Sequence, residues 1–353
     1  MKKNTRKILN IIIALALVLS LAACSTGTTN KETPATDTLD GGQKYVIGFS
    51  NCSMAHSWRT AFVDTMLYEV EKNSDIIEDF IQLDADGDIN KQLADCEDLL
   101  NQDIDILLLS PQTSDALAPV GKMCAERNIP LIVVDRSISS EDYTSAVISD
   151  GVKMGAVIAE YAAKKYDGKF NWINLEGTPG AGPNEERNKG LDSVFANYPD
   201  IKLLSKQPCN WSEAEGLEVM ENLLQAYPDI DVVIPSNGDI ALGAYKAIKA
   251  AGRENEIEII SIDCSRNDCL TAMKDGKITM YTATNPVYQG GLAIRVCLEI
   301  LKGGSVDKQI SVPPPIVTED NFDQWYFPND EPGDYSYWKT VYTDDLAKEI
   351  LGF

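Results

Sequence analysis

The most restrictive feature of this sequence is a regular alternation of two kinds of segment between Tyr45 and Lys302. Short runs rich in β-branched and other apolar residues are each followed by a longer amphipathic stretch with helical periodicity. This order is typical of βαβ units, in which parallel strands form a sheet and helices cover both of its faces. The alternation therefore predicts an α/β fold.

Ten segments are predicted as strands, which is more than one sheet usually holds. We therefore divide the chain into two lobes, residues 44–149 with 286–312 and residues 150–285 with 313–353. Asp150 and Asn285 are the expected crossings, and the prolines after Val312 should end any regular element. The expected strands are residues 45–49, 77–83, 104–109, 131–134, 146–149, 170–175, 202–205, 232–235, 258–262 and 278–282. The expected helices are residues 60–73, 91–101, 115–128, 152–166, 185–198, 212–227, 240–252, 288–302 and 344–351.

The N-terminal segment has the pattern of a secretory signal peptide. A basic stretch precedes an almost wholly apolar run from Ile8 to Leu21, which is too short for a mature membrane-spanning helix. The small residues before Cys24 resemble the lipobox of bacterial lipoproteins, in which the cysteine is lipidated and becomes the new N-terminus. We therefore predict a signal peptide over residues 1–23, lipidation at Cys24 and a lipidated linker over residues 24–43. This predicts an extracytoplasmic protein anchored to the cell membrane by lipid.

The charge and histidine content exclude several functions. The chain has 31 Lys and Arg residues against 54 Asp and Glu residues, so its net charge of -23 makes a nucleic-acid partner implausible. His56 is the single histidine, so no multi-histidine metal site can form and little is available for acid–base catalysis near neutral pH. Acidic residues alternate from Asp84 to Asp88, but Ile89 stands where a calcium loop needs glycine. We expect no metal, no cofactor and no enzymatic activity.

Seven cysteines follow Cys24, and their spacing shows no CxxC pair or disulfide framework. An odd number leaves at least one of them unpaired. We interpret most of them as small buried apolar residues. We therefore expect all seven to be free thiols.

Polar and aromatic residues follow the predicted strands at the end where ligands bind in open α/β sheets. Carboxylates, amides and arginines can bind neighbouring hydroxyl groups, and the face of a tryptophan can cover the apolar C–H side of a sugar ring. Any one of these residues could instead cap a helix, as Asp135 or Asp239 could, but the set recurs at the same end of successive strands. We expect a neutral polyhydroxylated ligand to be bound by Asn51, His56, Trp58, Arg59, Asp135, Arg136, Glu176, Arg187, Trp211, Asn237, Asp263 and Asn285. His56 could either contact the ligand or face solvent.

Several of these motifs, taken together, resemble one family. Residues 129–136, residues 237–252 and residues 260–263 are similar to the type I periplasmic sugar-binding proteins, the ribose- and galactose-type receptors of ABC importers. Residues 58–62 and 175–181 are most similar to the galactofuranose-binding branch of that family. The resemblance covers roughly residues 44–313.

The resemblance implies a fold of two Rossmann-like lobes with parallel sheets, joined by a multi-strand hinge that closes on the sugar (periplasmic binding protein type I). It implies that Asp135 and Arg136 bind ring hydroxyls and that Trp58 stacks on the sugar. Asn285 takes a place often held by glutamine, and Cys264 stands where the family usually has glycine. The remaining roles implied for the second lobe belong to Arg187, Trp211, Asn237 and Asp263.

The resemblance implies a lipid-anchored, monomeric receptor that captures a monosaccharide, galactofuranose- or ribose-like, and delivers it to an ABC permease. An alternative is a sensor that presents the sugar or a signal molecule to a membrane receptor kinase, which the pocket residues alone do not distinguish. A sugar hydrolase would need two carboxylates across the glycosidic bond, for which Glu176 and Asp263 could be invoked. A repressor of the same fold is disfavoured because a signal peptide stands where a helix-turn-helix should be.

Overall fold

The structure is a computed structural model that describes residues 44–353, and two parallel sheets organise it. The predicted signal peptide, the lipidation site Cys24 and the linker over residues 24–43 lie outside the described residues. None of the helices in residues 44–353 is long and apolar enough to cross a bilayer. The α/β fold with parallel sheets is confirmed.

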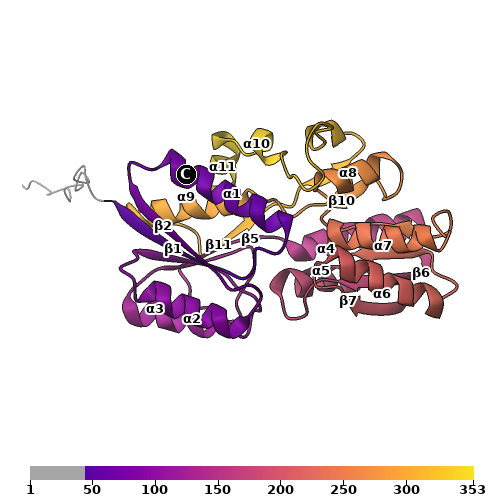
Figure 1. The fold of residues 1–353 in the computed structure, drawn as a ribbon, viewed down its shortest axis with the longest axis horizontal. Helices are drawn as coiled ribbons and strands as arrows, with labels where there is room; N and C mark the ends of the chain where they lie inside the picture. The colour runs from indigo at the N-terminus through magenta and orange to yellow at the C-terminus, as the bar shows by residue number, and fades with distance from the viewer. Residues whose placement is uncertain (1–43) are drawn as a thin grey trace, which may run out of the picture. The chain divides into compact units, whose positions relative to one another are not determined.

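The first lobe is built on a six-stranded parallel sheet in the order β11-β5-β4-β3-β1-β2. Helices α1 and α9 cover one face of this sheet, and α2 and α3 cover the other (Figure 1). Strands β3 and β4 are buried along their whole length, which accounts for their continuous apolar sequence. The strands are β1 (Tyr45–Asn51), β2 (Ile77–Asp84), β3 (Ile106–Ser110), β4 (Leu131–Val134), β5 (Ser145–Ser149) and β11 (Gln309–Val312). The helices are α1 (Ser57–Lys72), α2 (Ile89–Leu100), α3 (Pro119–Arg127) and α9 (Gln289–Leu301).

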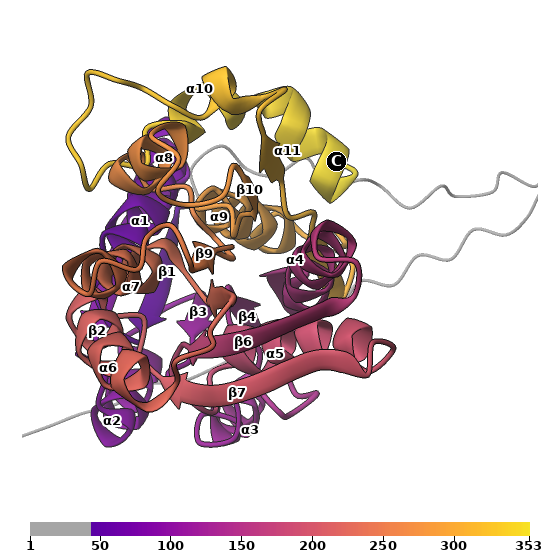
Figure 2. The same ribbon diagram turned by 90° about the vertical axis from the view of Figure 1, so that its right-hand side faces the viewer.

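The second lobe is built on a four-stranded parallel sheet in the order β7-β6-β8-β9, with β7 at its edge (Figure 2). Helices α4 and α5 pack together on one face, and α6 and α7 pack together on the other. The strands are β6 (Lys169–Glu176), β7 (Asp200–Pro208), β8 (Val232–Pro235) and β9 (Glu258–Ile259). The helices are α4 (Gly151–Lys165), α5 (Gly182–Phe195), α6 (Glu213–Ala226), α7 (Gly238–Ala250) and α8 (Asn267–Lys274).

Three segments carry the chain between these sheets. The first follows β5 at Asp150, the second follows β10 (Tyr281–Ala283), and the third contains the prolines between β11 and β12 (Ile316–Thr318). Strands β10 and β12 form a short antiparallel pair. The prolines separate β11 from β12 because proline cannot donate to a strand ladder.

The C-terminal segment differs from the prediction that assigned all of residues 313–353 to the second lobe. Its elements are the 3-10 turn η1 (Phe322–Gln324), α10 (Trp338–Val341) and α11 (Asp344–Leu351). Helix α11 contacts α9 and β11, which belong to the first lobe. This final helix therefore packs on the first lobe and not, as predicted, on the second.

Candidate functional site

A cavity of about 230 Å³ lies at the carboxyl ends of strands from both sheets. Pockets for drug-sized ligands occupy about 300–1,000 Å³, so this one suits a smaller molecule. Turns after β1, β4, β6, β7, β8 and β10 supply most of its wall. The lining residues are Ser53, His56, Trp58, Arg59, Gly87, Gln112, Asp135, Arg136, Thr178, Pro183, Arg187, Asn210, Trp211, Asn237, Asp263, Asn285 and Tyr335.

The first lobe contributes a tight ion pair between Arg59, near the start of α1, and Asp135, directly after β4. Arg59 Nη2 lies 2.6 Å from Asp135 Oδ2, and the two side chains are only 4% and 3% exposed. Arg59 Nη1 also donates to Ser110 Oγ at 3.0 Å. Because both side chains are buried, each charge is compensated by the other and by neighbouring protein groups rather than by water.

The second lobe repeats the arrangement with Arg187 of α5 and Asp263. Arg187 Nη2 lies 3.3 Å from Asp263 Oδ2, and Arg187 Nη1 donates to the carbonyl of Ser236 at 2.7 Å. Both side chains are nearly inaccessible. Each lobe thus contributes a buried arginine–aspartate pair to the lining of the cavity.

Both aspartates adopt a left-handed backbone conformation, with φ of 65° at Asp135 and 52° at Asp263. Such values are uncommon for residues other than glycine, and they cluster at functional sites because the surrounding structure must hold them. Asn210 and Trp211 in the turn after β7 share the feature, with φ of 46° and 63°. These turns bend the chain sharply at the strand end, which directs the side chains into the cavity.

Asn285 connects the two aspartates. Its backbone N–H donates to Asp263 Oδ1 at 2.8 Å, and its side-chain Nδ2 donates to Asp135 Oδ1 at 3.1 Å. Gln289 donates in turn to Asn285 Oδ1 at 3.1 Å. A single hinge residue therefore touches the charged groups of both lobes.

Two tryptophans form apolar walls of the cavity. Trp58 stacks on Phe62, and its Nε1 donates to the carbonyl of Asn285 at 2.9 Å. Trp211 is 8% exposed, and the guanidinium of Arg187 lies 5.3 Å from the centre of its ring. A Cβ on Gly177 would overlap the Trp211 ring, so only glycine fits there.

Three buried donors on cavity-lining residues have no hydrogen-bond partner among the described residues. They are Arg136 Nε, Arg187 Nε and Trp211 Nε1. An unsatisfied buried donor costs free energy, so a bound acceptor would stabilise each of these three groups. A hydroxylated ligand could supply the acceptors that these groups lack.

The cavity shifts the pKa of two of its lining residues. Burial, reinforced by Arg136 and Arg59, lowers the pKa of His56 from 6.5 to about 4. Burial raises the pKa of Asp263 from 3.8 to about 6, although Arg187 opposes the shift. His56 is therefore neutral at pH 7, and it offers one donor and one acceptor rather than a charge.

The structure brings ten of the twelve predicted site residues together around the cavity and leaves Asn51 and Glu176 outside its lining. Asn51 is buried and donates to Asp84 Oδ1 at 2.9 Å. Glu176 accepts from Asn188 and lies 3.2 Å from Lys206 Nζ. Both end a strand, but their side chains are engaged by neighbouring elements of their own lobes. The carboxylate pair invoked for a hydrolase is thus not formed.

Sequence reasoning missed seven lining residues, and most of them follow strands that it had identified. Gln112, Thr178 and Asn210 lie two residues after the ends of β3, β6 and β7, so the rule that selected the other residues also applies to them. Tyr335 gives no such signal because it lies in the C-terminal segment, beyond all strands. The others are Ser53, Gly87 and Pro183.

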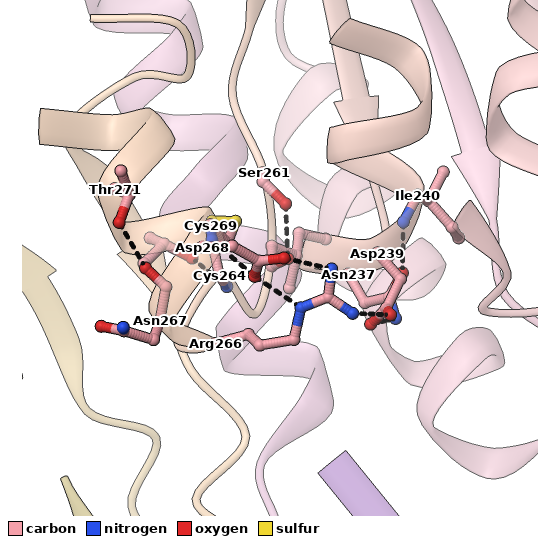
Figure 3. The surroundings of a disulfide bond; sticks show 12 residues. Asn237, Asp239, Ile240, Ser261, Cys264, Arg266, Asn267, Asp268, Cys269 and Thr271 are labelled. Carbon is pink, nitrogen blue, oxygen red and sulfur yellow. Dashed lines mark hydrogen bonds and ion pairs between the residues drawn. A yellow bond between two sulfur atoms is a disulfide. The ribbon is translucent and has the colours of Figure 1, made fainter. Parts of the chain in front are cut away.

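The expectation of seven free thiols is wrong, because Cys264 and Cys269 form a disulfide directly after Asp263. The turn into α8 brings their Cα atoms to 5.7 Å, a separation that a disulfide requires. Figure 3 shows Arg266, inside this loop, reaching Asp239 and Asp268. The other five cysteines of the described chain are free and buried, as expected: Cys52, Cys96, Cys124, Cys209 and Cys297.

Within residues 44–353, no group of three or more His, Cys, Asp or Glu side chains is placed to hold a metal ion. Asp88 in the acidic stretch instead caps α2, where its side chain accepts from the N–H groups of Asn90 and Lys91. The cavity wall thus consists of hydrogen-bonding and aromatic groups.

Comparison with known proteins gives consistent matches. A family model described as periplasmic binding protein domain matches residues 47–305. The ribose import binding protein RbsB of Bacillus subtilis (strain 168) is 33% identical over 317 residues, which cover 89% of this chain and 99% of that protein. The galactofuranose-binding protein YtfQ of Escherichia coli (strain K12) is 28% identical over 277 residues, or 75% of this chain and 85% of that protein.

A solved structure gives the same result. The periplasmic binding protein component of the arabinose ABC transporter from Shewanella sp. ANA-3, bound to α- and β-L-arabinofuranose, superposes with a TM-score of 0.74 at 29% identity. The match covers 79% of this chain and 93% of that chain. Residues 47–305 contain every cavity-lining residue except Tyr335.

Proposed function

The chain belongs to the family of periplasmic binding protein domains, and on this premise we propose that it captures one neutral monosaccharide outside the cytoplasm and delivers it to an ABC importer. The observation that carries the proposal is the presence of two buried ion pairs, Arg59–Asp135 and Arg187–Asp263, at one cavity. Each of these pairs balances its own charge, and Arg136 is the one further charged side chain among the lining residues, so most of the cavity wall offers hydrogen bonds rather than net charge. Relatives named for ribose, galactofuranose and arabinofuranose support a ribose- or galactofuranose-like sugar.

The site is divided between the lobes, which gives the binding step a mechanism. Asp135 and Trp58 belong to the first lobe, Asp263 and Trp211 to the second, and Asn285 lies on the segment between them. A sugar that contacts both sets at once stabilises the closed arrangement over an open one, which is a population shift about a hinge. The two indole faces would cover the apolar C–H surfaces of the ring.

The proposal includes the N-terminal segment. Residues 1–23 would be removed as a signal peptide, Cys24 would carry lipid, and residues 24–43 would tether a monomeric binding domain to the membrane. The basic start, the apolar run and the small residues before Cys24 support this arrangement. Mass spectrometry of the N-terminal peptide of the mature protein tests it, because an unmodified Cys24 contradicts lipidation.

The ligand proposal is tested by a thermal-shift screen of the full-length chain against ribose, arabinose, galactose, galactofuranose, xylose, glucose and fructose. A ligand present at about 100 times its Kd adds about 2.7 kcal/mol of stability, which gives a clear shift in Tm. We expect one or a few sugars to give that shift. A panel without any shift contradicts monosaccharide capture.

A matched pair of tryptophan variants ties the shift to the cavity. Trp211→Leu removes an aromatic wall of the cavity, whereas Trp172→Leu removes a tryptophan of β6 that is buried in the core of the second lobe and does not line the cavity. We expect about a tenfold loss of sugar affinity by calorimetry for Trp211→Leu and almost none for folded Trp172→Leu. Equal affinities in the two variants would remove Trp211 from the site.

A further inference from the structure

The segment of residues 322–342, here called the C-terminal strap, lies outside residues 47–305 that match the family model. Its first half is attached to the second lobe at the start of α8. The N–H of Asn267 donates to the carbonyl of Asp334 at 2.9 Å, and the N–H of Asp268 donates to that of Pro332 at 2.9 Å. Backbone pairing of this kind fixes the path of the strap largely independently of its side chains.

The second half of the strap is attached to the first lobe. Trp338 packs edge-on against Tyr68 of α1 with ring centres 5.7 Å apart. The hydroxyl of Tyr342 donates to Glu69 Oε1 at 2.9 Å. The strap therefore passes from one lobe to the other, and Figure 1 shows the course of its segment between α8 and α10.

Tyr335 lies between these two attachments and is 7% exposed. It lines the ligand cavity, and it also lines a separate groove of about 290 Å³ between α1 and the strap. Tyr335 is the only one of residues 44–353 that lines both spaces. The phenol ring is thus a partition between the cavity and a groove larger than the cavity itself.

We propose that Tyr335 is a specificity-determining residue, whose ring closes one end of the ligand site and limits the site to a single sugar ring. The proposal rests on the function proposed above and adds a size limit from a segment outside the matched family region. Removing the ring would connect the cavity to the groove, whose lining includes Ser57, Asp64 and Lys339. These polar groups could hold the second ring of a disaccharide.

The electrostatic surroundings suit this role. Burial, reinforced by Asp239 and Asp263, raises the pKa of Tyr335 well above its ordinary value of 10. The phenol is therefore neutral at pH 7. A neutral ring wall with a hydroxyl can contact a sugar without introducing a charge.

The test measures calorimetric affinities of the full-length chain and three variants for ribose, arabinose and galactose, and for the disaccharides lactose and maltose. Tyr335→Ala removes the partition, and Tyr335→Phe keeps the ring and removes only the hydroxyl. Tyr326→Ala is the matched control, since this strap tyrosine stacks on Phe322 and lines neither space. Circular dichroism and Tm verify that each variant is folded.

We expect Tyr335→Ala to bind the preferred monosaccharide about tenfold or more weakly and to gain affinity for a disaccharide relative to it. Tyr335→Phe and Tyr326→Ala should keep the selection for monosaccharides. Wild-type affinity and selection in folded Tyr335→Ala would overturn the size limit and leave the proposed function standing. If the wild-type chain binds no sugar at all, the proposed function fails and the inference falls with it.

Discussion

Asp135 and Asp263 hold equivalent positions in the two lobes, each after a strand and each paired with a buried arginine, but their surroundings differ. Asp135 lies 2.6 Å from its arginine and accepts further bonds from Asn285, at 3.1 Å, and from Gln289, at 3.4 Å. Asp263 lies 3.3 Å from Arg187 and accepts one further bond, from the backbone N–H of Asn285 at 2.8 Å, and burial raises its pKa to about 6. The carboxylate of the first lobe is thus better satisfied than that of the second.

The difference indicates that the two lobes contribute to ligand binding in different ways. The pair in the first lobe is complete within the described residues, so its geometry is set before a ligand arrives. In the second lobe, Arg187 Nε, which belongs to the pair itself, and the neighbouring Trp211 Nε1 have no partner among residues 44–353, whereas the unpartnered cavity-lining donor of the first lobe, Arg136 Nε, lies outside its pair. We infer that the first lobe orients the sugar and that the second lobe gains most of its missing hydrogen bonds when the sugar binds.

The largest expected effect is the loss of stability when either aspartate is replaced by alanine. Asp135→Ala leaves Arg59 buried without a counter-charge and should lower the free energy of unfolding by about 3–5 kcal/mol. Asp263→Ala should cost less, because its contact with Arg187 is longer and its charged form is already disfavoured. Urea unfolding at pH 7 measures both values.

Backbone strain needs a control in this experiment, since alanine is disfavoured at a positive φ. Asp167 has φ of 50° and forms no ion pair within the described chain, so Asp167→Ala reports the cost of strain alone. Equal losses for Asp135→Ala and Asp263→Ala, after subtraction of this control, would contradict the comparison.

A smaller effect is expected from opening the disulfide, which only the second lobe has. Cys264→Ser combined with Cys269→Ser should lower the free energy of unfolding by about 2 kcal/mol, as for any loop this short. Ligand affinity should fall too, because the loop follows Asp263 and its residues Asn267 and Asp268 hold the C-terminal strap. Unfolding and calorimetry with and without reductant measure both changes.

Cys124→Ser is the matched control for the disulfide, because this cysteine is free and buried in the first lobe. Its stability should not respond to reductant beyond the wild-type response. A titration of the denatured, unreduced protein should find five thiols in residues 44–353. Seven thiols, or an unchanged affinity in the double variant, would contradict the role of the loop.

Asn285→Ala should lower the free energy of unfolding by about 1 kcal/mol, mainly through lost contacts in the first lobe. The change removes the side-chain bond to Asp135 but keeps the backbone N–H that donates to Asp263 at 2.8 Å. Sugar affinity should fall by about tenfold, since Asn285 lines the cavity. The prediction fails if combining Asn285→Ala with Asp135→Ala costs as much as the sum of the two, because that would mean that the residues do not interact.

The smallest expected effect is in the pH dependence of stability. The folded pKa of Asp263 is about 6, above its ordinary 3.8, so the folded state binds more protons between these values and this group lowers stability as pH rises through that window. The folded pKa of His56 is about 4, below its ordinary 6.5, so this group adds stability above pH 6.5 that is lost as pH falls towards 4.

The two contributions oppose each other between pH 4 and 6. Together, these two groups should therefore change the free energy of unfolding of the wild-type protein very little over that range. Asp263→Asn should leave a slope in which stability rises with pH, and His56→Gln should leave the opposite slope. Unfolding midpoints measured from pH 4 to 8 test both. Parallel curves for the two variants would refute the assigned pKa shifts.

The sequence predicts the order of strands and helices well because hydrophobic periodicity reports local burial. Prediction was weakest where tertiary contacts decide the outcome. The segment expected as a strand over residues 258–262 has only two residues in β9, and the short β11 and β12 around the prolines were missed. Their pairing depends on partners that are distant in the sequence, which local pattern does not encode.

The site shows the same limit. The rule that ligands bind beyond strand ends found Asp135, Asp263 and most of their neighbours, since strand ends are visible in the sequence. It could not show that Glu176 turns towards Asn188 and Lys206, because that depends on side-chain packing. Tyr335 reaches the cavity through the path of the strap, and no periodicity in the sequence specifies that path.

The packing of α11 on the first lobe has a practical consequence for measuring the motion of this protein. A dye on the exposed Glu349 of α11 would travel with the first lobe, and one on the exposed Glu218 of α6 would travel with the second. The free cysteines of the described chain are all buried, so Glu349→Cys and Glu218→Cys would be the accessible attachment points there. Energy transfer between the two dyes would then convert sugar binding into an optical signal.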